Sequence, residues 1–152
     1  MADNAKNIFV SHHHTDAESI EKLKDLLSKN GLTMRDSSIY ESKSQNNAHN
    51  EEYIKSLIRP QINWAGEIIV LIGSNTAKSD WVDWEIEAAA KKDKRIIGVY
   101  LPGEKDAELS DAFNTYADSL IGWDSSSIID ALNGEDIWVG PARNNMIQGV
   151  NC

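Results

Sequence analysis

The residue of this chain whose type and position best suit chemistry is Glu85, a carboxylate on the apolar side of an expected helix. Residues 79–90 follow an apolar run at 68–72 and a turn-forming stretch at 73–76, which predicts a strand, a loop and a helix. At about 100° per residue, Glu85 falls within the arc of apolar side chains, which comprises Trp81, Val82, Trp84, Ile86, Ala88 and Ala89. The opposite side of the helix carries Asp83, Glu87 and Lys91.

A carboxylate on a packing face is costly unless another group binds it. Two interpretations of Glu85 stay open at this point: a structural carboxylate satisfied by backbone groups or by a lysine, or a catalytic or ligand-binding carboxylate at the rim of a cleft. The start of the helix is well defined, because Ser79 or Asp80 can cap the free N–H groups of its first turn. Glu85 therefore lies in the second turn of the expected helix.

The composition is that of a single acidic domain. The chain has 152 residues, with 24 acidic against 15 basic side chains and a formal net charge of -9. That charge disfavours nucleic acid and anionic membranes as partners. The only cysteine, Cys152, cannot form an internal disulfide, and no apolar run approaches the roughly 18 residues of a membrane span. Because the N-terminus also lacks a signal-peptide pattern, we expect a soluble cytoplasmic protein.

Apolar runs and helical periodicity divide the chain into alternating strands and helices. Strands are expected at 8–10, 32–34, 68–72, 95–101 and 120–123. Helices are expected from a cap at Thr15 or Asp16 to Asn30-Gly31, then at 51–64, from 79 to about 92, at 109–117 and at 127–132. Pro60 should kink the second helix or end its regular part. Residues 1–6 form a loose lead-in, 7–132 the domain and 133–152 a polar tail that docks on the domain through 137–139.

Near-continuous apolar strands that alternate with helices are typical of a parallel sheet covered on both faces. Right-handed crossovers favour the flavodoxin-like strand order 2-1-3-4-5 in a single three-layer α/β domain. In that order, ligands bind beyond the carboxyl ends of strands 1 and 3. Ser11 and His12 follow strand 1, and Gly73 and Ser74 follow strand 3, just before the helix with Glu85. The topology and the misplaced carboxylate thus point to one crevice.

Other kinds of site find little support in the sequence. The run 12–14 of three histidines lacks a second cluster with ligand spacing, so we expect no metal site; Ser11 and His12 should line the crevice and the other histidines should be solvated. Neither a nucleophile elbow nor a phosphate-binding glycine loop occurs. A phosphoacceptor receiver needs an aspartate where this chain has Gly73-Ser74. The tryptophans divide into Trp64 and Trp123, expected in the core, and Trp81 and Trp84, which either pack or stack on a ligand.

Three short motifs, in their order and spacing, resemble a TIR domain. Phe9-Val10-Ser11-His12 is followed by Asp16, Asp36 comes after strand 2, and Ser79-x-Trp81-x-x-x-Glu85 opens the helix after strand 3. The closer resemblance is to the TIR-like proteins of the bacterial Thoeris antiphage system. Their pattern Asp-x-Ser-x-aromatic-Glu is matched by Asp36, Ser38, Tyr40 and Glu41, and their third strand and helix are matched at 71–74 and 81–86. The resemblance covers roughly residues 7–125.

What the resemblance implies is cleavage of the nicotinamide–ribose bond of NAD, with Glu85 in the catalytic position, NAD as substrate and no separate cofactor. The candidate substrate-binding residues are Phe9, Ser11, His12, Asp36, Ser38, Tyr40, Ser74, Trp81 and Trp84. In Thoeris-type enzymes the ADP-ribosyl group is captured by a nucleophile, which gives a cyclic or conjugated ADP-ribose that activates a separate effector. Many TIR active sites are completed by a neighbouring copy through the loop after strand 2, so self-association is also expected. In that loop, at 35–50, this chain lacks the Arg-Gly pair common in animal and plant TIR domains.

Two rival interpretations of the same pattern remain. Many TIR domains are non-catalytic interaction modules, in which case Glu85 is structural and the acidic surface is the docking face. A nucleoside deoxyribosyltransferase-like enzyme also uses a glutamate to break an N-glycosidic bond on a similar sheet. The two enzymes differ in substrate: the NAD-cleaving enzyme would consume NAD, whereas the deoxyribosyltransferase would exchange the base of a deoxynucleoside. Stabilisation by NAD separates the NAD-cleaving enzyme from the interaction module.

Overall fold

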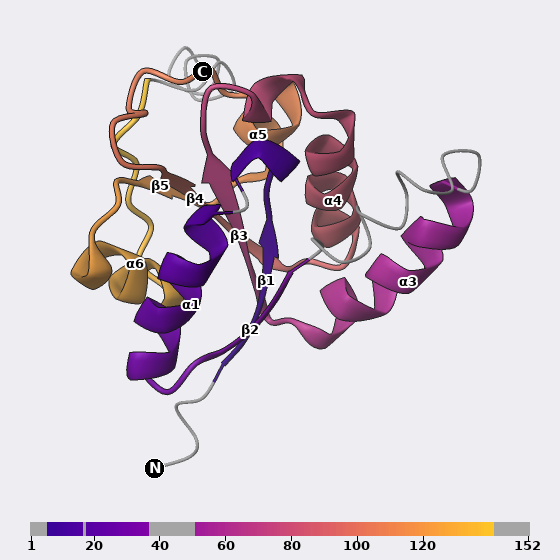
Figure 1. Ribbon diagram of the computed structural model, residues 1–152, viewed down its shortest axis with the longest axis horizontal. Helices are drawn as coiled ribbons and strands as arrows, with labels where there is room; N and C mark the ends of the chain where they lie inside the picture. The colour runs from indigo at the N-terminus through magenta and orange to yellow at the C-terminus, as the bar shows by residue number, and fades with distance from the viewer. Residues whose placement is uncertain (1–5, 17, 37–50, 142–152) are drawn as a thin grey trace, which may run out of the picture.

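Five parallel strands form one sheet in the order β2-β1-β3-β4-β5, the topology predicted from the sequence (Figure 1). The computed structural model describes residues 6–16, 18–36 and 51–141 of the chain. The strands are β1 (Asn7–Ser11), β2 (Thr33–Asp36), β3 (Glu67–Ile72), β4 (Arg95–Tyr100) and β5 (Ser119–Ile121). The helices are α1 (Glu18–Lys29), α3 (Glu51–Trp64), α4 (Asp80–Lys91), α5 (Asp111–Tyr116) and α6 (Ser125–Leu132), with 3-10 turns η2 (His14–Asp16) and η3 (Thr76–Lys78).

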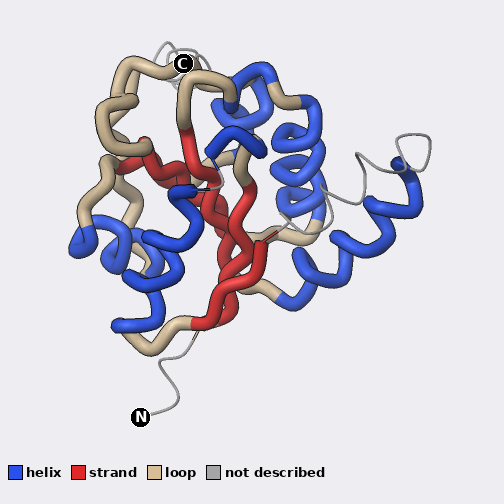
Figure 2. Tube along the Cα trace, in the orientation of Figure 1, coloured by secondary structure: helices blue, strands red, loops and turns tan. Residues whose placement is uncertain are grey.

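Helices cover both faces of the sheet, so the domain has the three expected layers (Figure 2). Alternate side chains of one strand enter opposite cores: Phe9 packs on the side of α3, α4 and α5, whereas Val10 packs on the side of α1 and α6. Central strand β3 does the same, since Val70 joins the first core and Leu71 the second. Burial on both faces is the reason that these strands read as continuous apolar runs.

The helices begin and end where local chemistry predicts. In α1 the buried residues Ile20, Leu23 and Leu27 keep helical spacing, and Gly31 after its end adopts the expected left-handed conformation with φ 75°. In α4 the hydroxyl of Ser79 accepts a hydrogen bond from the Val82 amide at 3.1 Å, so Ser79 is the N-cap. Within the described ranges, no helix is long and apolar enough to cross a bilayer.

Helix α3 has the predicted bounds and continues through Pro60, because Ile58 and Ile62 on either side of the proline are anchored in the core while Pro60 itself is exposed. Several other element ends differ from the expected ones. Strand β2 extends to Asp36, which pairs with Val10 of β1, so Asp36 ends the strand instead of following it. Strand β5 is shorter than expected and stops at Ile121, before Gly122.

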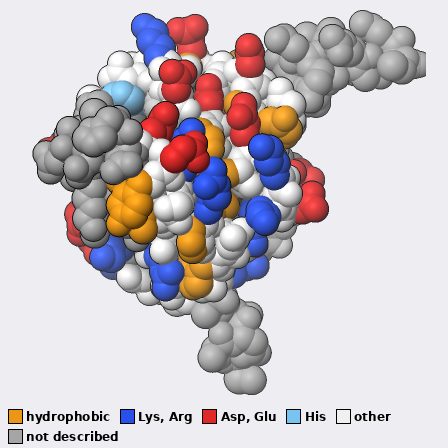
Figure 3. All heavy atoms as spheres, turned by 90° about the vertical axis from the view of Figure 1, so that its right-hand side faces the viewer, with side chains coloured by type: hydrophobic (Ala, Val, Ile, Leu, Met, Phe, Trp, Pro, Cys, Tyr) orange, Lys and Arg blue, Asp and Glu red, His pale blue; other side chains and the backbone are white. Residues whose placement is uncertain are grey.

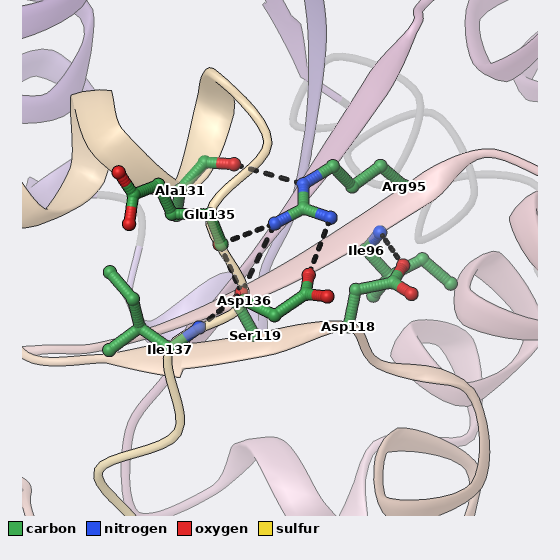
Figure 4. Close-up of polar contacts among 8 residues, drawn as sticks. All are labelled: Arg95, Ile96, Asp118, Ser119, Ala131, Glu135, Asp136 and Ile137. Atoms are coloured by element: carbon green, nitrogen blue, oxygen red, sulfur yellow. Dashed lines mark hydrogen bonds and ion pairs between the residues drawn. The ribbon is translucent and has the colours of Figure 1, made fainter.

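A segment after α6 runs along the outer edge of β5. Backbone hydrogen bonds join Leu120 N to Ile137 O at 2.7 Å and Val139 N to Leu120 O at 2.9 Å. The Arg95 guanidinium anchors this segment, because it donates to the carbonyls of Ala131 and Glu135 and pairs with the Asp136 carboxylate at 2.8 Å (Figure 4). The ring of Trp138 also stacks on Phe113, with 5.8 Å between ring centroids. Residues 135–139 thus give β5 a second neighbour.

Candidate active site

The Glu85 carboxylate is fully buried and hydrogen-bonded to the end of strand β1, which lies between β2 and β3 in the sheet. The hydroxyl of Ser11 donates a hydrogen bond to Oε1 of Glu85 at 2.5 Å, and both residues have 0% exposed surface. Ser11 is the last residue of β1, whereas Glu85 lies in the second turn of α4. The sequence argument that Glu85 points toward the packing side of its helix is therefore confirmed. The hydrogen bond fixes the position of one carboxylate oxygen.

The end of β1 supplies three of the candidate residues. Phe9 and Ser11 lie on the same side of the strand, toward α4, and Phe9 is enclosed in the core on that side. His12 follows directly and is also fully buried. His13 is half-buried, and its Nδ1 lies 2.7 Å from the Thr15 hydroxyl. Since Ser11 pairs with Val70 of β3, these residues lie where the first and third strands end together.

The turn between β3 and α4 is held against the turn after β1. The Gly73 amide donates to the Thr76 hydroxyl at 2.9 Å, and that hydroxyl donates to the Leu71 carbonyl at 3.1 Å. A Cβ on Gly73 would lie 3.0 and 3.1 Å from the carboxylate oxygens of Asp16. The absence of a side chain at 73 therefore lets the two turns approach closely. Sequence reasoning placed Thr76 in this turn but did not predict that its hydroxyl bonds the Gly73 amide and the Leu71 carbonyl.

The two tryptophans of α4 have different surroundings. Trp81 lies one turn before Glu85 on the same side of the helix, and its indole N–H is buried without a hydrogen-bond partner among the described residues. Trp84 faces α3, where Lys55 Nζ and the Arg59 guanidinium lie 5.3 and 5.5 Å from its ring centroid. The two rings are 5.7 Å apart, tilted by 33°. Trp81 is thus the tryptophan adjacent to the carboxylate.

The remaining candidate residues lie at or beyond the edge of the described structure. Ser74 is exposed in the turn after β3. Asp36 ends β2 beside Val10, so its backbone borders the same end of the sheet. Ser38 and Tyr40 lie outside the described residues. Trp64 and Trp123, which were expected in the core, are partly buried against its two halves. Among the candidate residues, the described contacts join Ser11 to Glu85; His12 follows Ser11 in the chain, and Trp81 lies one turn before Glu85.

Further carboxylates surround the start of α4 and its contact with α5. Burial raises the pKa of Asp83, and the nearby charges of Glu87, Asp80 and Asp111 raise it further, while a hydrogen bond with Ser110 acts in the opposite direction. The Ser110 hydroxyl also caps α5 by accepting from the Phe113 amide at 3.1 Å. This end of the helix is therefore strongly negative, which favours an electron-poor or cationic group nearby.

A second buried hydroxyl was missed by the sequence reasoning. Tyr100 ends β4, next to Ile72 of β3, and its hydroxyl is buried without a hydrogen-bond partner among the described residues. Burial raises the pKa of the phenol, and the Asp106 carboxylate raises it further. A Cβ on Gly140 would come within 2.9 Å of this hydroxyl, so the C-terminal segment closes over it. In the sequence, Tyr100 is merely the last residue of an apolar strand.

Comparisons with known proteins identify a family and a similar fold. The family model of the TIR-like domain of the Thoeris protein ThsB matches residues 9–106. A search of curated proteins finds no significant match. Among solved structures, the CMP N-glycosidase BcmB of Clostridium botulinum is similar, with a TM-score of 0.54 and 20% identity over 84% of this chain and 98% of that chain. The N-terminal domain of a response regulator/sensory box/GGDEF 3-domain protein from Carboxydothermus hydrogenoformans gives a TM-score of 0.49 and 11% identity over 84% of this chain and 90% of that chain.

The family match spans the part of the chain that builds the site. It begins in β1 with Phe9, includes Ser11 and Glu85, and ends in the loop after β4. It covers more than half of the 152 residues. The likeness to BcmB, at 20% identity, shows a shared fold. The chain therefore belongs to the family of Thoeris ThsB TIR-like domains.

Proposed function

We propose that this protein cleaves the N-glycosidic bond between nicotinamide and ribose in NAD and transfers the ADP-ribosyl group to a nucleophile. The product is a cyclic or conjugated ADP-ribose that activates a separate antiphage effector. The observation that carries this proposal is the Glu85 carboxylate, buried at the carboxyl ends of β1 and β3 and bonded to the Ser11 hydroxyl. A buried carboxylate at the topological switch point of a parallel sheet is suited to a ligand more than to packing.

The chemistry needs few groups, because nicotinamide leaves as a neutral molecule. As the bond from C1′ to the pyridinium nitrogen breaks, its electron pair goes to nicotinamide and positive charge develops on the ribose, as in other glycosyl transfers. The Glu85 carboxylate stabilises that charge and accepts hydrogen bonds from the ribose hydroxyls. A water molecule, a hydroxyl or nitrogen of the ADP-ribosyl group itself, or an added nucleophile then attacks C1′ and releases a proton to solvent. Trp81, one turn from Glu85, is placed to contact the nicotinamide ring.

The best alternative is cleavage of another N-glycosidic bond. The similar structure from Clostridium botulinum is described as a CMP N-glycosidase, and a nucleoside deoxyribosyltransferase performs related chemistry. The same carboxylate would then stabilise charge on a nucleotide or deoxynucleoside sugar. The third interpretation, a non-catalytic interaction module, requires Glu85 to be structural only. These three functions differ in substrate, which makes them separable by one assay.

The test is mass-resolved chromatography of purified protein incubated with NAD, with CMP, or with a deoxynucleoside and a free base. Each substrate is tested with and without extract from phage-infected cells, because TIR-like enzymes of this type act on infection. We expect NAD to yield nicotinamide and a new ADP-ribosyl species, and we expect no reaction with CMP or with the deoxynucleoside. Glu85→Gln should abolish both, while Glu87→Gln, on the exposed side of the same helix, should leave them unchanged. Release of cytosine or base exchange would support the alternative enzymes.

The partners of the reaction follow as part of the proposal. We assign the effector a diffusible product as its ligand, so no stable complex between the two proteins is needed. Self-association of two copies would complete the crevice and so put the activity under control of assembly. We also propose that the protein acts in the cytoplasm. Light scattering of the protein with NAD, recorded beside nicotinamide release, tests this part. Full activity in a strictly monomeric sample would contradict it.

A further inference from the structure

A cavity of about 190 Å³ lies between α3 and α4, apart from the Glu85 site. It is lined by Arg59, Ile62, Asn63, Trp84, Glu87, Ala88, Lys91 and Lys92. Its α4 members recur every three or four residues and so form one stripe of that helix. Glu85 is turned away from this stripe toward Ser11 of β1. The cavity therefore shares no residue with the carboxylate and its hydrogen-bond partner.

The floor of the cavity is apolar and includes an aromatic ring. Ile62 is buried, and Ala88 and Trp84 are half-buried. The Trp84 ring is held in place by its contact with Trp81 and by the two cations of α3 near it. A fixed indole beside two aliphatic side chains is a surface on which a planar apolar group packs or stacks.

The rim of the cavity is cationic, although the chain as a whole is strongly acidic. Three of the lining residues, Arg59, Lys91 and Lys92, carry positive charge and one, Glu87, carries negative charge, in a chain of net charge -9. Figure 3 shows Lys and Arg side chains gathered over the middle and lower part of this face, with hydrophobic side chains between them. Lys91 and Lys92 make no ion pair within the described residues. These two positive charges are therefore not neutralised by any ion pair with a described residue.

The position of these cations is not explained by helix stability alone. Lys91 and Lys92 end α4, where positive charge is favourable to the helix dipole. Arg59, in contrast, comes from the middle of α3 and is held over the cavity by the Trp84 ring and by Glu52 at 3.8 Å. Arg59 of α3 and Lys91 and Lys92 at the end of α4 thus lie around the same apolar floor of the cavity.

We propose that this cavity binds a small aromatic anion, a planar ring that carries a phosphate or carboxylate. The ring packs on Trp84, Ile62 and Ala88, and the anionic group lies among Arg59, Lys91 and Lys92. The volume of about 190 Å³ is below the range of about 300–1,000 Å³ typical of ligand pockets, so the cavity suits one ring with its anionic group, and a dinucleotide such as NAD does not fit within it. The site is thus distinct from the proposed substrate site in both place and ligand size.

The test is isothermal titration calorimetry of the full chain with AMP as the probe. Adenosine supplies the ring without the anion, inorganic phosphate the anion without the ring, and nicotinate a ring with a carboxylate. AMP should bind, with adenosine and phosphate each about tenfold weaker or more, since each loses one part of the contact. Nicotinate tells whether a carboxylate replaces the phosphate.

Matched variants then locate the site. Lys91→Glu/Lys92→Glu should weaken AMP by about tenfold or more, whereas Lys22→Glu/Lys24→Glu, the same charge change on exposed residues of α1, should change it by about twofold or less. Lys91→Gln/Lys92→Gln, with circular dichroism of all variants, serves as a milder second test. Glu85→Gln should leave AMP binding unchanged. No saturable binding at about 10 mM AMP, equal loss in both charge-reversal pairs, or loss in Glu85→Gln would each overturn the proposal.

Discussion

The Ser11 hydroxyl donates a hydrogen bond to Oε1 of Glu85 over 2.5 Å and so joins the end of strand β1 to the second turn of α4. This single contact joins two residues that are 74 positions apart in the chain. It brings a side chain of modest polarity against a carboxylate in a region with no exposed surface. The consequences of that arrangement can be measured separately for activity and for stability.

Ser11→Ala is expected to reduce the rate of NAD cleavage more than the affinity for NAD. Without the hydroxyl, the carboxylate loses its fixed orientation, and hydrogen bonds to charged groups contribute about 1.5–3 kcal/mol. We expect kcat to fall about ten- to hundredfold with KM changed by less than about threefold. Steady-state kinetics measures both. Ser28→Ala, an exposed serine of α1, is the control. An unchanged kcat would show that Ser11 has only a packing role.

Gly73→Ala is expected to destabilise the domain by about 1–3 kcal/mol, because its new methyl group meets the Asp16 carboxylate and Leu101. Denaturant unfolding followed by circular dichroism measures the change. Gly66→Ala is the matched control, since a Cβ there meets nothing within 4 Å. The cost of Gly73→Ala should shrink in an Asp16→Ala background, where part of the crowding is removed. Equal costs in both backgrounds would contradict a direct contact.

Arg95→Met is expected to cost about 2–4 kcal/mol of unfolding free energy, because its guanidinium satisfies the carbonyls of Ala131 and Glu135 and pairs with Asp136. Methionine keeps most of the aliphatic stem but none of the donors. Thermal unfolding measures the loss. Lys24→Met, on the exposed side of α1, controls for the removal of one positive charge. A loss no larger than that of the control would mean that solvent replaces these bonds at no cost.

Asp83→Asn is expected to shift stability in a pH-dependent manner. The folded state raises the pKa of Asp83 above its usual 3.8, so the folded protein holds the proton more tightly than the unfolded chain. Ionisation of Asp83 therefore removes stability as pH rises from the unfolded pKa through the raised folded pKa. The asparagine variant escapes that loss, so its stability relative to wild type should increase as pH rises from below 3.8 through the raised folded pKa of Asp83. Unfolding curves across this range, with Asp25→Asn of α1 as control, test the sign; a constant difference would refute it.

The sheet and the direction of Glu85 could be predicted because both follow from local periodicity. Apolar runs gave the strands, and a helical arc placed Glu85 among buried neighbours, where it is found. The ends of elements were less predictable, since they depend on contacts distant in sequence. Helix α3 has its predicted bounds, with Ile58 and Ile62 buried on either side of Pro60, but β2 continues to Asp36, which pairs with Val10 of β1.

The partners of individual side chains were the least predictable part of the site. The arc of α4 contains both tryptophans, yet only the packing of α3 decides that Trp84 meets Lys55 and Arg59 while Trp81 lies nearer the carboxylate. Likewise, no local pattern marks Arg95 as the anchor of a segment about forty residues later. Such contacts depend on three-dimensional assembly and leave no periodic trace in the sequence.

The segment that runs beside β5 also determines the order in which the domain can be completed during synthesis. Strand β5 is three residues long, and its outer neighbour at 135–139 comes after it in the chain. A nascent chain that has made β1 to β4 can assemble most of the sheet, but Arg95 then still lacks the acceptors supplied by Glu135 and Asp136. Because domains fold as units while they emerge from the ribosome, the outer edge of this sheet is completed only after residues 135–139 have been made. A translation stalled before residue 135 would therefore leave a protein with Glu85 already made and one edge of its sheet still open.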